Sequence, residues 1–200
     1  MSRAARRKHE QGSGLFIVIL IAACLAAMGL SILTLTAMGP KMAGGLRTQE
    51  EAFNAAEAGF DAARAEIEDH FAVGDWTDFS GRTLTVPTGI DIPFNSGVAN
   101  AAYFRRKTDD ELMRLFDAAG DGTPDVAPLV AFRQTFALDG AGAVDPRLVY
   151  TAFLINDEAG GGAADPSDAL LVVIGEVRQG TRTLASTRLE IGLSYQAQGN

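Results

Sequence analysis

Cysteine and histidine are scarce in this chain of 200 residues, which narrows the chemistry it can carry. The single cysteine, Cys24, excludes an intramolecular disulfide. The two histidines, His9 and His70, belong to no metal-ligand spacing and to no evident catalytic triad. A phosphate-binding loop is also missing, because the triple glycine at 160–162 has no Lys-Ser/Thr after it. We therefore do not expect an enzyme.

Positive charge is the minority charge of the chain, whose net charge is −8. The first twelve residues have the opposite net charge, because they contain four Lys or Arg and one Glu and so carry +3. The remaining residues then carry −11. Phosphate binding needs clustered Lys and Arg, so we do not expect nucleic acid as a partner.

Charge is absent altogether from residues 13–38, a run of 26 residues that follows the basic leader at 1–12. As a helix this run would be about 39 Å long, which is enough to cross a hydrocarbon core of about 30 Å. The basic leader marks the cytoplasmic end by the positive-inside rule. We expect a single transmembrane helix at 13–38, with the rest of the chain outside the cytoplasm.

Residues 39 and 40 interrupt the helical pattern. They are Gly39-Pro40, and proline removes a backbone donor and disfavours helix in the residue before it. The sequence therefore predicts either a kink or a short melted segment at this point.

A second, amphipathic helix is expected at residues 41–72, continuing the first. Its apolar residues recur at spacings of three, four and seven, which places them on one face. We expect this face to pack against the protein's own globular part. A free coiled coil is the alternative, although a seam of Phe and Ala is a poor zipper. The predicted packing face consists of Met42, Leu46, Phe53, Ala56, Phe60, Ala63, Ile67 and Phe71.

The remaining residues, 73–200, predict a globular α+β head. Short β-favouring runs alternate there with Gly-, Asp- and Pro-rich segments. Gln179-Gly180 is a hairpin signal, and consecutive strands joined by hairpins form an antiparallel meander. We expect a small antiparallel sheet with the long N-terminal helix on one face. The expected strands are 83–86, 129–138, 147–155, 169–178 and 181–195, and a short helix is expected at 109–116.

One acidic loop in the head has partial calcium-site spacing. Asp117, Asp121 and Asp125 fit positions 1, 5 and 9 of a calcium loop, and Thr123 offers a carbonyl at position 7. Carboxylates are missing at positions 3 and 12, and Asp-Gly and Pro also make ordinary turns. The loop is therefore either a calcium site or a turn without metal, and no other cofactor is expected.

Three stretches of the sequence resemble one protein family. The string GSGLF at 12–16, between a basic leader and an apolar run, is similar to the class III signal of type IV pilins and pseudopilins. The strings KMAGGLR at 41–47 and AFNAAEAGF at 52–60 resemble the N-terminal domain of PilX-type minor pilins. Those proteins carry Met-Ala-Gly-x-x-Arg after the span and then Ala-Phe-x-Ala-Ala-Glu-Ala.

The resemblance implies a processing event and a set of partners. A prepilin peptidase would cut between Gly12 and Ser13, N-methylate Ser13 and leave the span attached. The implied partners are that peptidase, other minor and major pilins, and the inner-membrane assembly platform. The implied location is the inner membrane, as a single-pass protein with a periplasmic head that is also a candidate for incorporation into a surface pilus.

Ile17 departs from the pattern of the major pilins. It would be the fifth mature residue, where those proteins have a glutamate thought to pair with the methylated N-terminus of a neighbouring subunit. A carboxylate in lipid is costly unless paired, so Ile17 eases membrane residence and weakens the case for repeated addition. The resemblance then implies a low-copy subunit. K-class pseudopilins of type II secretion also lack this glutamate, but they carry a large extra helical domain for which this chain has no room.

The sequence therefore predicts a minor pilin, a structural subunit that helps to initiate, prime or tip a type IV pilus-like fibre. An independent membrane-anchored binding module outside the cytoplasm, such as a calcium-dependent adhesin, is the alternative from another class. A pilus, a secretion pseudopilus and an uptake fibre are not distinguished at this level.

Overall fold

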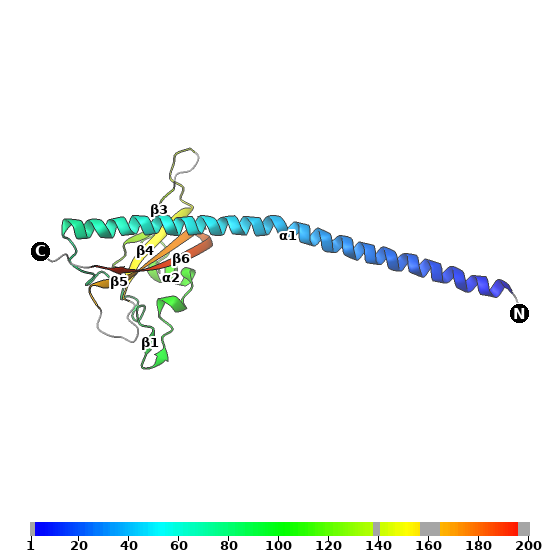
Figure 1. The fold of residues 1–200 in the computed structure, drawn as a ribbon, viewed down its shortest axis with the longest axis horizontal. Helices are drawn as coiled ribbons and strands as arrows, with labels where there is room; N and C mark the ends of the chain where they lie inside the picture. The colour runs from blue at the N-terminus through cyan, green and yellow to red at the C-terminus, as the bar shows by residue number, and fades with distance from the viewer. Residues whose placement is uncertain (1–2, 138–140, 157–164, 196–200) are drawn as a thin grey trace. The chain divides into compact units, whose positions relative to one another are not determined.

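The computed structural model of the chain describes residues 3–137, 141–156 and 165–195, and it divides into two compact units, Met1–Arg47 and Thr48–Asn200. The helix α1 (Arg3–Val73) belongs in part to each unit (Figure 1). The helix continues without a break through Gly39 and Pro40. Of the two expected alternatives at this point, a kink or a melted segment, the melted segment is therefore wrong.

The first unit is helical and apolar. Gly14–Thr34 is long enough and apolar enough to cross a membrane, and no other helix in the described part of the chain passes the same test. None of this segment is buried within the protein. Its hydroxyl groups return hydrogen bonds to the helix backbone, as Ser31 Oγ does to Ala27 O at 2.9 Å and Thr34 Oγ1 to Ser31 O at 2.8 Å. Such bonds would keep these polar atoms satisfied in a hydrocarbon environment.

The second unit is built on a four-stranded antiparallel sheet in the order β3-β4-β5-β6, which confirms the predicted meander. Strands β5 and β6 are joined at the predicted hairpin, where Gln179 pairs with Arg182 around a two-residue turn. Gly180 in that turn has φ 62°, a value that glycine adopts without strain. The strands are β3 (Ala131–Thr135), β4 (Leu148–Ile155), β5 (Asp168–Gln179) and β6 (Arg182–Ser194).

The segment between α1 and the sheet differs from the prediction in two places. The strand expected at 83–86 is a single bridge between Thr83 and Leu154, because the chain turns away at Pro87, which has no N–H to donate. A small hairpin that was not among the expected strands follows, formed by β1 (Phe94–Asn95) and β2 (Val98–Ala99).

Two short helices complete this segment. The helix α2 (Asp109–Phe116) has the predicted bounds, and a 3₁₀ turn, η1 (Phe104–Arg106), precedes it. Thr108 caps α2, because its side chain accepts from the Glu111 amide while the Glu111 carboxylate accepts from the Thr108 amide at 2.7 Å. These hydrogen bonds lower the pKa of Glu111.

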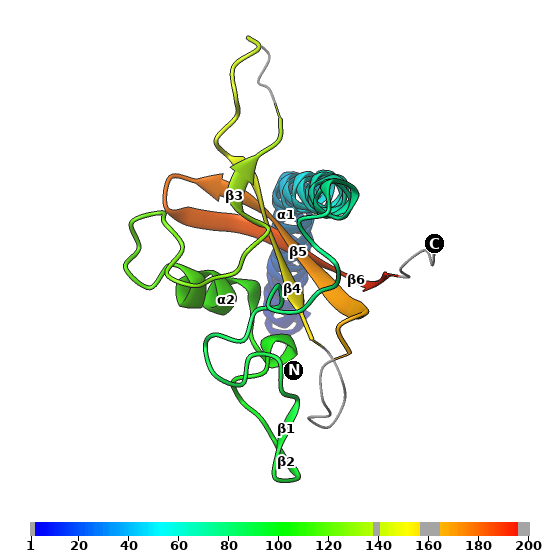
Figure 2. The same ribbon diagram turned by 90° about the vertical axis from the view of Figure 1, so that its left-hand side faces the viewer.

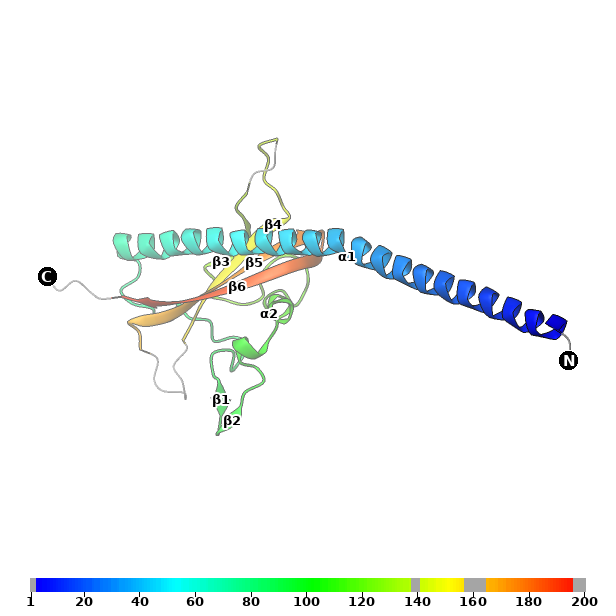
Figure 3. The ribbon, with the colours of Figure 1, turned by 45° about the vertical axis from the view of Figure 1, so that its right-hand side comes forward.

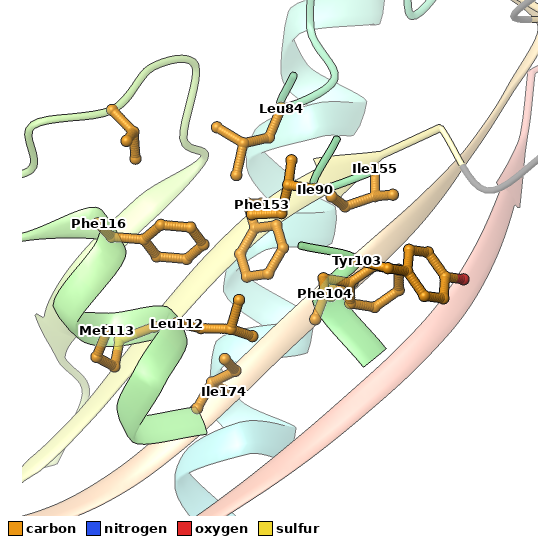
Figure 4. Packing of buried hydrophobic residues seen from close by; sticks show 12 residues of the cluster. Leu84, Ile90, Tyr103, Phe104, Leu112, Met113, Phe116, Phe153, Ile155 and Ile174 are labelled. Atoms are coloured by element: carbon orange, nitrogen blue, oxygen red, sulfur yellow. The ribbon is translucent and has the colours of Figure 1, made fainter. Parts of the chain in front are cut away.

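The sheet is buried on both faces. Along β5, Leu171 and Val173 point to a cluster shared with α1, while Val172 and Ile174 point to a cluster shared with α2. In Figure 2 the C-terminal part of α1 and the helix α2 lie on opposite sides of the sheet. Figure 4 shows the second cluster, where Phe116 and Phe153 meet edge to face at 4.9 Å.

The part of α1 within the second unit lies unusually close to the sheet and runs along one side of it in Figure 3. A side chain at Gly175 in β5 would collide with the backbone of Ala52 and Ala56. A side chain at Gly59 in α1 would come within 2.6 Å of the Tyr150 ring in β4. Two glycines, one on each element, therefore set the distance between helix and sheet.

This close approach shifts the buried face of the helix away from the predicted one. Ala52, Ala55 and Gly59, which the prediction omitted, are buried against the sheet, because only small residues fit there. Of the eight predicted residues, Ala56, Ala63 and Ile67 are buried, Phe60 and Phe71 are half-buried, and Met42, Leu46 and Phe53 are exposed.

We predict that Gly175→Ala destabilises the head by about 1–3 kcal/mol, the range expected for overpacking against an unyielding backbone. The matched control is Gly192→Ala in β6, where a methyl group would meet no atom within 4 Å. Denaturant unfolding of the full chain in detergent micelles measures both. Equal midpoints for the two variants would show that the contact between α1 and β5 is loose.

Candidate functional site

The apolar segment Gly14–Thr34, which is long enough to cross a membrane, is exposed along its length. Leu15, Phe16 and Ile17 are each more than half exposed, and the exposure continues to Leu33. Ile17 therefore presents an apolar side chain at the position where the major pilins have a glutamate. The backbone of Gly12 and Ser13 lies within α1, and their side chains are outside the described part of the structure.

The part of α1 in the second unit leaves one flank unoccupied. Phe53 keeps 42% of its surface exposed, although it is the largest apolar residue at its level of the helix. Glu50, Glu57 and Asp61 are also exposed, and no hydrogen bond or ion pair joins any of them to another described residue. This outer surface is free to meet another molecule.

The predicted calcium loop folds as a turn after α2 whose backbone amides bind its own carboxylates. The Thr123 amide donates to Asp121 Oδ1 at 2.8 Å, which lowers the pKa of Asp121. The Ala119 amide donates to Asp125 Oδ2 at 3.0 Å. Asp117 is buried and accepts both from the Gly122 amide, at 3.2 Å, and from Arg133.

No group of three or more acidic, histidine or cysteine side chains is arranged to hold a metal ion in the described ranges. The carboxylates of this loop are engaged by backbone amides and by an arginine instead. Calcium binding stays a hypothesis to which this geometry adds no support.

A buried ionic cluster that no sequence motif indicates lies beside that loop. Arg133 Nη1 in β3 donates to Asp117 Oδ2 at 2.6 Å, and Arg133 Nε lies 3.8 Å from Glu176 Oε2 in β5. The side chains of Asp117 and Glu176 are 3% and 1% exposed. Thr183 in β6 donates its hydroxyl to Glu176 Oε1 at 2.8 Å. One guanidinium therefore faces two buried carboxylates.

Arg133 is held in a strained conformation. Its φ is 44°, a region that non-glycine residues seldom occupy, and it sits in a bulge where β3 slips against β4 between Ala131 and Gln134. The bulge turns the arginine toward the α2 side of the sheet, where its guanidinium also lies over the Phe132 ring at 5.0 Å. The strain is tolerated because the ion pairs require this direction.

A cleft of about 570 Å³ opens over this cluster. It is bounded by α2, the loop after α2, β3 and the β5–β6 hairpin. Four arginines line it, which is unusual on a chain of net charge −8. They are Arg114, Arg133, Arg178 and Arg182.

Searches against family models, curated proteins and solved structures find no match to this chain. Support for a function therefore comes from its own residues and their arrangement.

We predict that Arg133→Met costs about 3–5 kcal/mol at neutral pH, because it leaves two buried carboxylates without a counter-charge.

Arg114→Met is the matched control. Arg114 pairs with Asp110 on the surface of α2, with side-chain exposures of 77% and 56%, so its loss should cost under about 1 kcal/mol. Urea unfolding at neutral pH measures both variants. Equal deficits for the two variants would contradict the assignment of Arg133 as a buried counter-ion.

Proposed function

We propose that this chain is a minor pilin, a membrane-anchored structural subunit that helps to initiate, prime or tip a type IV pilus-like fibre. The observation that carries the proposal is the helix α1, which contains both an exposed apolar segment, Gly14–Thr34, and the helix that packs on the head's antiparallel sheet. The leader and stem motifs that resemble PilX-type minor pilins lie on the same helix.

The apolar segment needs an apolar environment both in the membrane and in a fibre. Lipid supplies the first, and a bundle of like helices supplies the second. Small residues such as Ala26, Ala27 and Gly29 suit close helix packing in either setting. The exposed Phe53 extends an apolar surface beyond the membrane segment, where a neighbouring stem would cover it.

A low-copy role agrees with Ile17. Without a carboxylate at this position the segment has no ionic partner for the N-terminus of a neighbour, so addition of many copies lacks that driving force. The partners in this proposal are other minor and major pilins, the prepilin peptidase and the inner-membrane assembly platform. The head then lies in the periplasm until the subunit enters a fibre.

We predict that co-expression with a prepilin peptidase yields a chain that begins at an N-methylated Ser13. Intact-mass measurement and N-terminal sequencing detect both the cut and the methyl group. Gly12→Leu should block the cut, because the family that the leader resembles is cleaved after glycine, while the membrane segment itself is unchanged.

A known pilin processed in the same cells shows that the peptidase is active. An intact N-terminus of the wild-type chain under those conditions would overturn the pilin proposal and favour an independent membrane-anchored binding module. Processing of Gly12→Leu at the same site would show that another peptidase makes the cut.

A further inference from the structure

The four-stranded sheet has two outer strands, and their free edges differ. β3 is short, and its bulge at the left-handed Arg133 interrupts the row of backbone groups that a further strand would need. β6 has 13 residues, contains neither proline nor lysine, and keeps a regular register against β5 from Ala185 to Ser194. Short strands, bulges, proline and lysine are the usual means of protecting a sheet edge. Of the two edges, that of β6 is therefore the one suited to accept another strand.

Two hydrogen bonds show which backbone groups of β6 point outward. The Tyr195 amide donates to Ser167 O, directly across the ladder from it, at 2.8 Å. Because directions alternate along a strand, the odd-numbered residues from 187 to 193 also bond to β5. The even-numbered residues then point away from the sheet. The Gln49 side chain agrees with this alternation, since it donates to Ser186 O from outside the ladder at 3.1 Å.

The outward groups between residues 188 and 194 form an unoccupied row about 20 Å long. Each of the four residues in this row contributes one N–H donor and one C=O acceptor. No hydrogen bond from another described element reaches these backbone groups. Such a row is a template for pairing with another chain. We call the outward backbone of Arg188, Glu190, Gly192 and Ser194 the open edge.

The two sides of the open edge differ in chemistry. On the α1 side lie Leu189 and Ile191, which are both half-buried. On the α2 side, the charges of Arg188 and Glu190 are already paired within the chain. A strand that lies along this edge would therefore cover apolar side chains on the α1 side and need no charge on the α2 side.

A second copy of this chain is poorly suited to fill the open edge. α1 and β6 run in the same direction, because Gln49 contacts Thr187 and, further along both elements, Phe71 stacks on Tyr195. Antiparallel pairing of two β6 strands would therefore point the two α1 helices in opposite directions. In the proposed function both helices lead into one membrane from the same side, which this pairing does not allow. The bulged edge of β3 in a second copy offers no regular row either.

We propose that the open edge binds an extended strand from a pilin subunit of different sequence, which adds antiparallel to β6 as a fifth strand of the sheet. The inference rests on the proposed function, which supplies neighbouring subunits with heads of their own. The added strand carries apolar residues toward Leu189 and Ile191 and small polar residues toward α2. Because the edge of β3 is protected, the sheet is extended on one side alone, which agrees with a low-copy subunit.

Proline substitutions test the direction of the backbone groups. Gly192→Pro removes one outward donor and leaves the bonds to β5 intact, whereas Ile191→Pro removes a donor to β5. In urea unfolding of the full chain in detergent micelles, we expect a midpoint near that of the wild type for Gly192→Pro. Ile191→Pro should unfold at a much lower urea concentration. Equal losses for the two variants would overturn the assignment of the open edge.

A strand peptide tests whether the open edge accepts a partner. The probe is a dye-labelled peptide of about nine residues that alternates valine and threonine and has a lysine at each end, and fluorescence polarisation measures its binding. Gly192→Ala keeps the donor, and its methyl group meets no atom within 4 Å, so it should bind like the wild type. Gly192→Pro should bind at least about ten-fold more weakly, a difference of about 1.4 kcal/mol. Equal binding by Gly192→Pro, or no binding by the wild type at about 1 mM peptide, would overturn the proposal.

Cross-linking in the cells that naturally make the chain identifies the occupant. A photoreactive phenylalanine analogue replaces either Gly192 at the open edge or, as a control, the exposed Val98 of the β1–β2 hairpin. Mass spectrometry should find, at position 192 and not at position 98, a different protein that itself begins after a cleaved pilin leader. A cross-link to a second copy or to a protein of another class, or no cross-link at position 192, would overturn the proposal.

This proposal and the proposed function fail in different ways. A chain that is processed at Ser13 but whose open edge stays unoccupied remains a minor pilin without this contact. A chain that is not processed loses the proposed function, and with it a pilin as the occupant, whatever the peptide shows.

Discussion

The distance between α1 and the sheet governs the rest of the head. A side chain at Gly175 has no room beside the backbone of Ala52 and Ala56, and one at Gly59 would meet the Tyr150 ring. At this separation the helix buries backbone and methyl groups rather than large side chains. Dispersion between closely packed backbones replaces the apolar area that Leu or Phe would bury. The stability of the stem on the head then depends on shape more than on hydrophobic area.

This constraint decides where the large apolar residues of the stem go. The phenylalanines of the predicted packing face are too large for the contact, so Phe60 and Phe71 lie along its margin and Phe53 stays exposed. The opposite side of the helix carries charged residues. This part of α1 therefore presents an apolar flank at Phe53 and an acidic outer side at the same time.

The sequence predicted what depends on local pattern and missed what depends on distant partners. The meander follows from short β-favouring runs and a hairpin turn, and α2 follows from apolar residues on one side of 109–116. The buried face of α1 was predicted in part, because Ala56, Ala63 and Ile67 are buried. Large residues dominate a periodicity argument, however, while the contact selects small ones. The cluster of Arg133, Asp117 and Glu176 joins three separate segments through a bulge with φ 44°. No pattern of residue types in the sequence indicates that bulge, so the cluster could not be predicted.

One ionic cluster is buried inside the head. There the guanidinium of Arg133 pairs with two carboxylates that are nearly inaccessible to water, and these ion pairs hold β3 and the loop after α2 in place.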